Sequence, residues 1–179
     1  MPNAGDMIRR IGARLVLVVA ITSTIGCDRV TKHVALASLS DGHVRSYVSD
    51  MVRLQYVENT GGFLGIGAGL PDTVRVTLFT TLTGAVLVGL AIVAMRHRWQ
   101  GWLLIGAWLV IAGGASNWMD RVVRGSVVDF MNVGIGPLRT GIFNVADVAI
   151  MVGVAIVALT AFRHDRVRDS APATFGRVD

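Results

Sequence analysis

The sequence predicts an all-α membrane protein, a four-helix transmembrane bundle that carries a small extracytoplasmic β-sheet. Of its 179 residues, 53% are hydrophobic and 16% are charged, whereas soluble domains carry about 25% charged residues. Three apolar stretches, 76–95, 101–119 and 140–162, are expected to span the membrane, because about 20 helical residues cover the roughly 30 Å hydrocarbon core. Asp147 is the one charged residue inside the third stretch.

The first span is less regular than these three. Residues 15–27 are uncharged, and the polar segment 28–32 joins them to the apolar residues 34–39. One helix over 11–39 is therefore expected, with its polar end at the membrane interface. A cleaved lipoprotein signal ending at Cys27 is the alternative, since arginines precede the apolar run. The spanning helix is favoured because three more spans follow, and because Thr24 stands where such signals have an aliphatic residue.

Charge predicts how the four spans are oriented. The segments 1–14, 96–98 and 163–179 share one side and hold nine arginines against four aspartates. The segments on the other side hold eight basic and eight acidic residues. Positively charged loops favour the cytoplasm, so both termini are expected there. The chain is expected to form a single membrane domain over 1–168, followed by a disordered cytoplasmic tail over 169–179.

The composition also narrows the function classes. A net charge of +5 and a pI near 10.6 are compatible with nucleic-acid binding, but the basic residues flank the apolar runs and form no patch. The single cysteine and the four scattered histidines show no zinc-site spacing. We therefore expect no nucleic-acid partner, no metal and no cofactor. Cys27 is interpreted as a small apolar helix residue rather than a nucleophile.

The two outer loops are expected over 40–73 and 120–139. Within the first, residues 51–58 alternate apolar and polar side chains, which predicts a strand with one apolar face. The following segment 59–62 has the composition of a turn. We expect a small sheet that lies on the membrane surface.

Two carboxyl groups are the main candidates for chemistry. Asp147 lies about five residues below the outer edge of its predicted span, where a charge is costly. Asp129 stands between apolar residues in the second outer loop. Two carboxyls in a poorly solvated site share a proton, so that one deprotonates a water and the other acts as an acid. The simpler interpretations are an ion pair of Asp147 with Arg121 or Arg139, and a turn capped by Asp129.

Further polar residues gather at the outer ends of the spans. Asn117, Asp120 and Arg121 fall within one helical turn, where Asp120 could hold Arg121 in place. Asp28 and Lys32 have the spacing of a helical ion pair, and Lys32 is the only lysine in the chain. Plain interfacial salt bridges explain these pairs equally well. Serine catalysis is disfavoured, since no Gly-x-Ser-x-Gly motif is present.

Together these motifs resemble the lipoprotein signal peptidases (signal peptidase II), aspartyl proteases of the bacterial inner membrane. Members of this family cleave the signal peptide from prolipoproteins whose cysteine carries a diacylglyceryl group. Five motifs match in chain order: Asp28-Arg29-Val30-Thr31-Lys32, Asn59-Thr60-Gly61, the glycine-rich segment 113–121, Gly125-Ser126-Val127-Val128-Asp129-Phe130, and Phe143-Asn144-Val145-Ala146-Asp147.

The resemblance implies roles for ten residues. Asp129 and Asp147 would be the catalytic dyad, while a second set would bind substrate: Asn59, Gly61, Asn117, Arg121 and Asn144. Asp28, Lys32 and Asp120 would make supporting polar contacts. The resemblance also implies a short periplasmic helix, an active site on the periplasmic face, and prolipoprotein substrates and membrane lipids as partners. A monomer is expected.

Two departures from the family pattern concern the outer loop and the third span. Gly62-Phe63-Leu64 brings the aromatic residue one place early, and Ser116 stands where glycine is common. Both are expected to affect substrate fit more than activity. The alternative function is a small proton-coupled or lipid-binding membrane protein with structural carboxylates. A proton carrier needs ionisable residues that reach both faces, and the stretch 76–95 has none.

Overall fold

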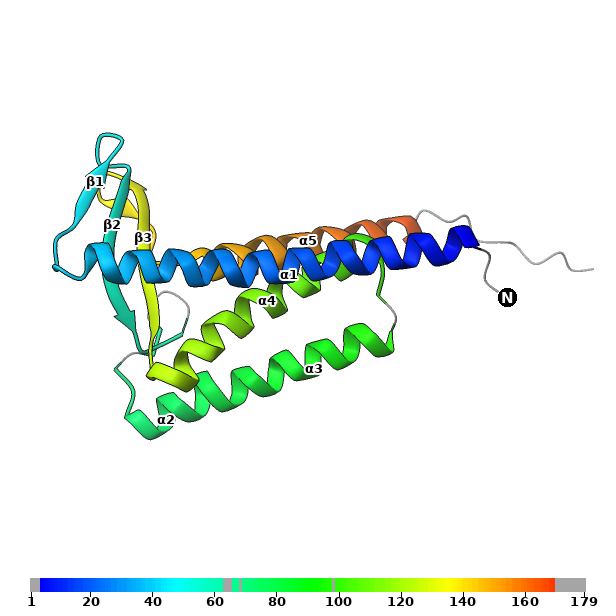
Figure 1. The fold of residues 1–179 in the computed structure, drawn as a ribbon, viewed down its shortest axis with the longest axis horizontal. Helices are drawn as coiled ribbons and strands as arrows, with labels where there is room; N and C mark the ends of the chain where they lie inside the picture. The colour runs from blue at the N-terminus through cyan, green and yellow to red at the C-terminus, as the bar shows by residue number, and fades with distance from the viewer. Residues whose placement is uncertain (1–3, 63–65, 68, 98, 170–179) are drawn as a thin grey trace, which may run out of the picture.

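Long helices run side by side, and a small sheet lies at one of their ends (Figure 1). A computed structural model describes residues 4–62, 66–67, 69–97 and 99–169. The helical elements are α1 (Ala4–Leu39), α2 (Asp72–Val76), the π-helical η2 (Thr77–Leu82), α3 (Thr83–Arg96), α4 (Gly101–Arg124) and α5 (Val145–Asp169). The beginning of α1 and the end of α5 lie at the same end of the molecule, opposite the sheet (Figure 1).

Three helical segments in the described part of the chain are long and apolar enough to cross a membrane. They are Asp72–Arg96, Gly101–Arg124 and Val145–Phe162, so most of each apolar stretch found in the sequence is helical. Helix α1 has 36 residues and lies alongside α4 and α5. That α1 is a fourth span remains a prediction.

The ends of the predicted spans differ from those of the helices. The second span begins at Asp72, because α2, η2 and α3 follow one another without a break. No separate short helix stands in the outer loops among the described residues. Helix α5 begins at Val145 rather than at residue 140, since Phe143 is extended and pairs with Met131 of the sheet. The predicted tail lies outside the described residues, apart from Asp169, which ends α5.

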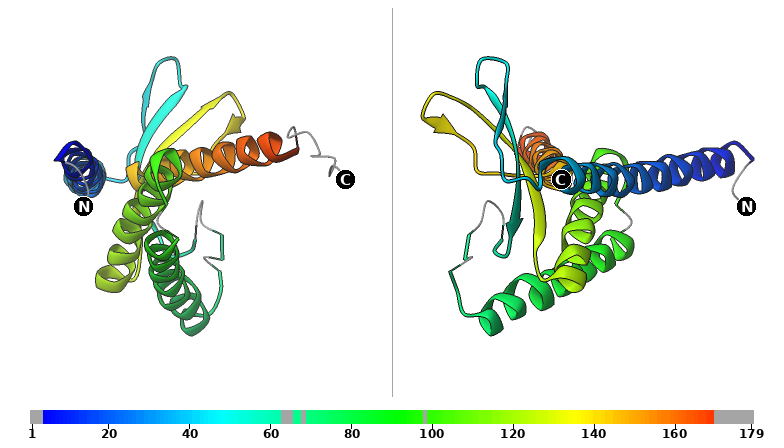
Figure 2. Two further views of the ribbon diagram at one scale, coloured as in Figure 1. Left: turned by 90° about the vertical axis from the view of Figure 1, so that its right-hand side faces the viewer. Right: turned by 60° about the vertical axis from the view of Figure 1, so that its left-hand side comes forward.

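The sheet has four antiparallel strands in the order β1-β2-β3-β4. The strands are β1 (Arg45–Tyr47), β2 (Val52–Asn59), β3 (Val127–Ile135) and β4 (Leu138–Arg139). Strand β2 confirms the strand predicted over 51–58. Its pairing with β3 sets Val57 opposite Asp129 and Asn59 opposite Val127. The turns at the far ends of the strands project away from the helices (Figure 2).

Small residues bring α4 close to α5. A Cβ atom on Gly113 would lie 2.5 Å from the carbonyl oxygen of Ala146, and one on Gly153 would lie 2.6 Å from that of Gly106. Glycine at membrane helix contacts allows such close approach of backbones. At its outer end α4 stops at Gly125, whose φ of +75° supplies the left-handed C-cap. These contacts fix the start of α5 against α4.

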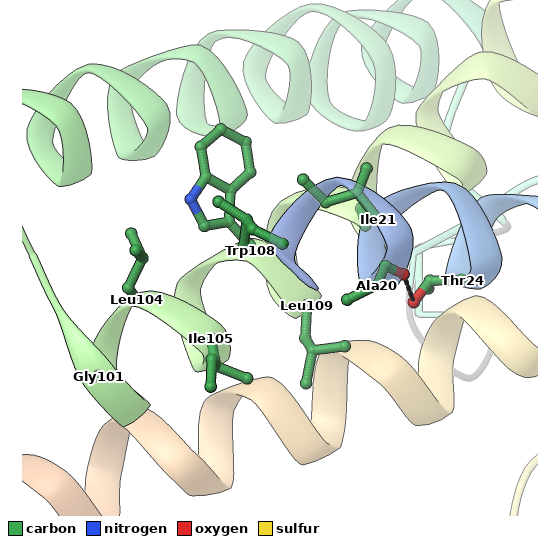
Figure 3. A pocket seen from close by; sticks show the side chains of 10 residues that line it. Ala20, Ile21, Thr24, Gly101, Leu104, Ile105, Trp108 and Leu109 are labelled. Atoms are coloured by element: carbon green, nitrogen blue, oxygen red, sulfur yellow. Dashed lines mark hydrogen bonds between the residues drawn. The ribbon is translucent and has the colours of Figure 1, made fainter. Parts of the chain in front are cut away.

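An apolar cavity of about 270 Å³ lies between α1 and α4 (Figure 3). Leu104 and Trp108 line it from α4, and Ile21 lines it from α1. Its outermost lining residues are Thr24 and Ala112, which lie one helical turn below Asp28 and Ser116. The cavity therefore stops short of the polar residues at the sheet end of the helices.

Candidate active site

Buried polar side chains gather where the sheet meets the adjacent ends of α1, α4 and α5. This group includes eight of the predicted site residues: Asp28, Lys32, Asn59, Asn117, Asp120, Asp129, Asn144 and Asp147. The hydrogen bonds given below join them into one connected network. Sequence positions up to 118 residues apart are thereby brought into contact.

Asp129 lies on β3, and each of its carboxylate oxygens accepts one hydrogen bond from an asparagine amide. Its Oδ1 accepts a hydrogen bond of 2.6 Å from Asn144 Nδ2, and its Oδ2 accepts one of 2.8 Å from Asn59 Nδ2. Burial raises the pKa of Asp129 above the usual 3.8, although these amides and the positive charges of Lys32 and Arg121 act in the opposite direction. The site thus favours retention of a proton near Asp129.

Asp147 lies in the first turn of α5, nearer to the helix end than the sequence predicted. Its backbone N–H donates to Asn144 Oδ1 at 3.0 Å, and the N–H of Asn144 donates to Asp147 Oδ2 at 3.1 Å. This reciprocal pair is a capping box, in which Asn144 is the N-cap and Asp147 is the third helical residue. The start of α5 therefore fixes both residues relative to each other.

Three asparagine amides direct their N–H groups at the two carboxyls. Asn59 and Asn144 donate to Asp129, and Asn117 Nδ2 donates to Asp147 Oδ1 at 2.9 Å. Asn144 Nδ2 also donates to Asn117 Oδ1 at 3.2 Å. An aspartate at any of these positions would lack the donor. Asn144 contacts both carboxyls, so it links Asp129 with Asp147.

Lys32 contacts the side-chain oxygen of Asn117, whose side-chain nitrogen donates to Asp147. Its Nζ donates to Asn117 Oδ1 and lies 2.7 Å from a carboxylate oxygen of both Asp28 and Asp120. An ammonium group donates hydrogen bonds and cannot accept them, so Lys32 requires the oxygen of Asn117 to face it. The nitrogen of Asn117 must then face Asp147.

Asp28 and Asp120 extend this network to α5 and to the surface. Asp28 Oδ1 accepts the backbone N–H of Ala146 at 2.9 Å, and its Oδ2 accepts the hydroxyl of Ser116 at 2.7 Å. Asp120 Oδ1 accepts from Arg29 Nη1 at 2.6 Å. The two oxygens of Asp120 accept hydrogen bonds from Arg29 and Lys32, and Asp120 interacts with Arg121 through its charge.

Arg121 joins α4 to the loop that follows β2. Its Nη2 donates to the carbonyl oxygen of Gly61 at 2.6 Å, and its guanidinium lies 5.9 Å from the centre of the Phe79 ring. Neither Arg121 nor Arg139 forms an ion pair with Asp147 in the described structure, and Arg139 lies at the far end of the sheet beside Asp50. The structure thus brings Arg121 and Gly61 together, while Phe63 and Leu64 lie outside the described residues.

Sequence reasoning missed three contributors to the site: Arg29, Ser116 and Ala146. Arg29 and Asp120 are 91 positions apart, and Ser116 and Asp28 are 88 apart, so local spacing gives no sign of either pair. The capping box was visible in principle, since Asn144 and Asp147 have the required spacing. That pattern would have set the start of α5 correctly.

Comparisons with known proteins give the family. A family model described as signal peptidase (SPase) II matches residues 19–163. The chain belongs to this family. The lipoprotein signal peptidase of Streptococcus pneumoniae is 32% identical to it over 153 residues, which cover 85% of this chain and 95% of that protein. The lipoprotein signal peptidase of Rhodococcus jostii is also 32% identical, over 82% of this chain and 73% of that protein.

A solved structure described as a bacterial membrane enzyme shares the fold. It superposes with a TM-score of 0.70 and 22% sequence identity, covering 92% of this chain and 94% of that chain. Together with the apolar helices, family membership makes this signal peptidase II relative a multi-pass bacterial membrane protein of a protease family. The residues matched by the family model include both carboxyls of the site.

Proposed function

We propose that the chain is an aspartyl endopeptidase that releases signal peptides from prolipoproteins at the outer face of the inner membrane. The observation that carries this proposal is the shared placement of Asp129 and Asp147. Both are buried, and one asparagine, Asn144, contacts both carboxyls. Two desolvated carboxyls held by amide donors favour a state in which one is ionised and the other is protonated.

Peptide hydrolysis by Asp129 and Asp147 needs only a water molecule, because the two carboxyls donate and accept every proton that is transferred. The ionised carboxylate removes a proton from water, and the water oxygen attacks the carbonyl carbon of the scissile peptide bond. The protonated carboxyl gives its proton to the carbonyl oxygen, which leaves a neutral diol. When the C–N bond breaks, the first carboxyl gives its proton to the leaving nitrogen, and one of the two diol hydroxyls returns its proton to the second carboxylate as the carbonyl reforms.

The surrounding residues supply positioning. Asn117 keeps its N–H toward Asp147, and Asn59 keeps its N–H toward Asp129. Arg121 ties the loop at Gly61 to α4, which favours the loop as one wall of the substrate cleft. In this proposal Asp28, Lys32 and Asp120 support the site without touching the peptide. Orientation of reacting groups in this way accounts for a large part of catalysis in general.

The proposed substrate carries a diacylglyceryl group on the cysteine next to the cleavage point. An open apolar groove of about 580 Å³ runs between α3 and α4 and includes Trp118. Trp118 directly follows Asn117 of the site, so a lipid-modified peptide can place acyl chains in the groove while its backbone reaches the carboxyls. The expected orientation, with both termini cytoplasmic, puts this site on the periplasmic side.

The test is cleavage of a diacylglyceryl-modified prolipoprotein by the purified protein in detergent with EDTA present, since the mechanism uses no metal. Asp129→Asn and Asp147→Asn should each lower kcat by about 10²–10⁴-fold, with the fold verified by circular dichroism. Asp72→Asn is the matched control, because Asp72 is an exposed carboxylate at the start of α2. A wild type that cuts no such substrate, or either dyad variant with wild-type kcat, contradicts the proposal.

A further inference from the structure

We propose that Ser116 is a positioning residue for Asp147, acting through Asp28. The inference rests on the proposed function only for its effect on catalysis. Ser116 has no exposed surface, so the sequence-based expectation that this position affects substrate fit is not supported by its location. Its hydroxyl points instead at the carboxylate that caps the first turn of α5.

The Asp28 carboxylate connects three helices. One oxygen, Oδ2, receives both Lys32 Nζ from the same helix and the hydroxyl of Ser116 from α4, each at 2.7 Å. The other oxygen, Oδ1, receives the N–H of Ala146, the residue immediately before Asp147. Asp28 is fully buried, and a buried carboxylate depends on each donor that it retains. Ser116 therefore helps to fix the carboxylate that holds the start of α5.

A second path runs through Lys32. Its ammonium group donates to Asn117 and Asp120 and forms an ion pair with Asp28. While Ser116 supplies a second donor to Asp28 Oδ2, Lys32 is free to keep its contact with Asn117 Oδ1. Without the hydroxyl, Asp28 has a vacant acceptor site and draws the ammonium group toward itself. The orientation of Asn117, and with it the N–H directed at Asp147, is then less firmly held.

The proposed effect depends on the hydroxyl of Ser116 and not on the volume of its side chain. Alanine at position 116 keeps the Cβ atom and removes only the donor, while glycine removes both. If the hydrogen bond carries the effect, Ser116→Ala and Ser116→Gly should change kcat by similar factors. If packing carried it, glycine would be much worse than alanine.

The experiment uses the full chain in detergent and two readouts. Amide hydrogen exchange at Ala146 should be about three- to tenfold faster in Ser116→Ala than in the wild type, as expected for the loss of one hydrogen bond to a buried carboxylate. In the prolipoprotein cleavage assay, kcat should fall by about three- to tenfold with KM unchanged. Ser126→Ala is the matched control, since it removes another buried hydroxyl, one that donates to Glu58 rather than to Asp28.

The outcomes separate the two proposals. Unchanged exchange at Ala146 together with unchanged kcat overturns the positioning role, as does a raised KM with unchanged kcat. Equal effects of Ser126→Ala and Ser116→Ala also overturn it. If the wild type cleaves no prolipoprotein while Ser116→Ala still accelerates exchange at Ala146, the proposed function fails and the positioning of the α5 start by Ser116 stands.

Discussion

Two clusters of charged residues in this molecule have nearly the same contact lengths and opposite surroundings. In the buried cluster, Lys32 lies 2.7 Å from both Asp28 and Asp120. In the exposed cluster, Arg53 lies 2.6 Å from Asp50 near the β1–β2 turn. The side chain of Lys32 is 5% exposed and that of Arg53 is 38% exposed. Contact length alone therefore says little about what each cluster contributes.

The two clusters differ in how far their charged groups are removed from water. Hydrogen bonds from Arg53 and Ser46 hold the pKa of Asp50 well below its usual value, since water and the guanidinium both favour the ionised form. At Asp129, beside the buried cluster, burial is the largest influence and raises the pKa. The exposed cluster thus stabilises charge at a turn, while the buried one adjoins a site that favours a bound proton.

Removal of one cation from each cluster should affect stability very differently. Lys32→Met should destabilise the folded protein by about 3–5 kcal/mol, because buried Asp28 loses its ion pair while Asp120 keeps the one with Arg29. Arg53→Gln should cost far less, because its partner stays hydrated. Denaturant unfolding in detergent, followed by tryptophan fluorescence, measures both. Equal changes in the two variants would show that burial does not distinguish the clusters.

The close contact that sets α5 against α4 gives the next test. Gly113→Ala places a methyl group 2.5 Å from the carbonyl oxygen of Ala146, so the first turn of α5 must shift. We expect a loss of about 1–3 kcal/mol in stability and, since Asp147 follows Ala146, a fall in kcat of about tenfold or more. Gly89→Ala is the control, because a Cβ there meets nothing within 4 Å and helix propensity favours alanine. A Gly113→Ala protein with wild-type kcat would contradict the fixed start of α5.

Hydropathy and period-two patterning were sufficient for the helices and for β2, because both are local properties of the chain. They failed at residues 140–144, which are uncharged and resemble a span. What decides that segment is a hydrogen bond from the N–H of Phe143 to the carbonyl of Met131, together with the Asn144 cap. Hydropathy contains no information on either contact.

The sequence could predict those site residues whose polar type is unusual among their apolar neighbours. A carboxyl in an apolar stretch identified Asp147, and one among apolar loop residues identified Asp129. The partners of Asp120 were not predictable, because Arg29 is remote in sequence and Arg121 is adjacent to it. Which residue pairs with a carboxylate depends on how α1 packs on α4, and the sequence of one helix does not determine that packing.

The smallest effect is expected at the turn that the exposed cluster supports. Val48, Ser49 and Asp50 all have positive φ, with Val48 at 53°, a conformation that a β-branched residue rarely adopts. Asp50 fixes the turn through Ser46 and Arg53, while Arg139 Nη1 donates to its backbone carbonyl oxygen. The exposed charges therefore hold a strained turn in place.

Val48→Asn should raise the free energy of unfolding by about 1 kcal/mol, because asparagine tolerates the left-handed region. Val44 is also exposed and has no positive φ, so Val44→Asn should give no such gain in the same denaturant assay. A stabilisation by Val44→Asn as large as that by Val48→Asn would point to surface polarity as the cause. If only Val48→Asn stabilises the protein, the gain comes from relief of backbone strain at the turn beside the exposed cluster, whereas the buried cluster orients Asn117 and the start of α5.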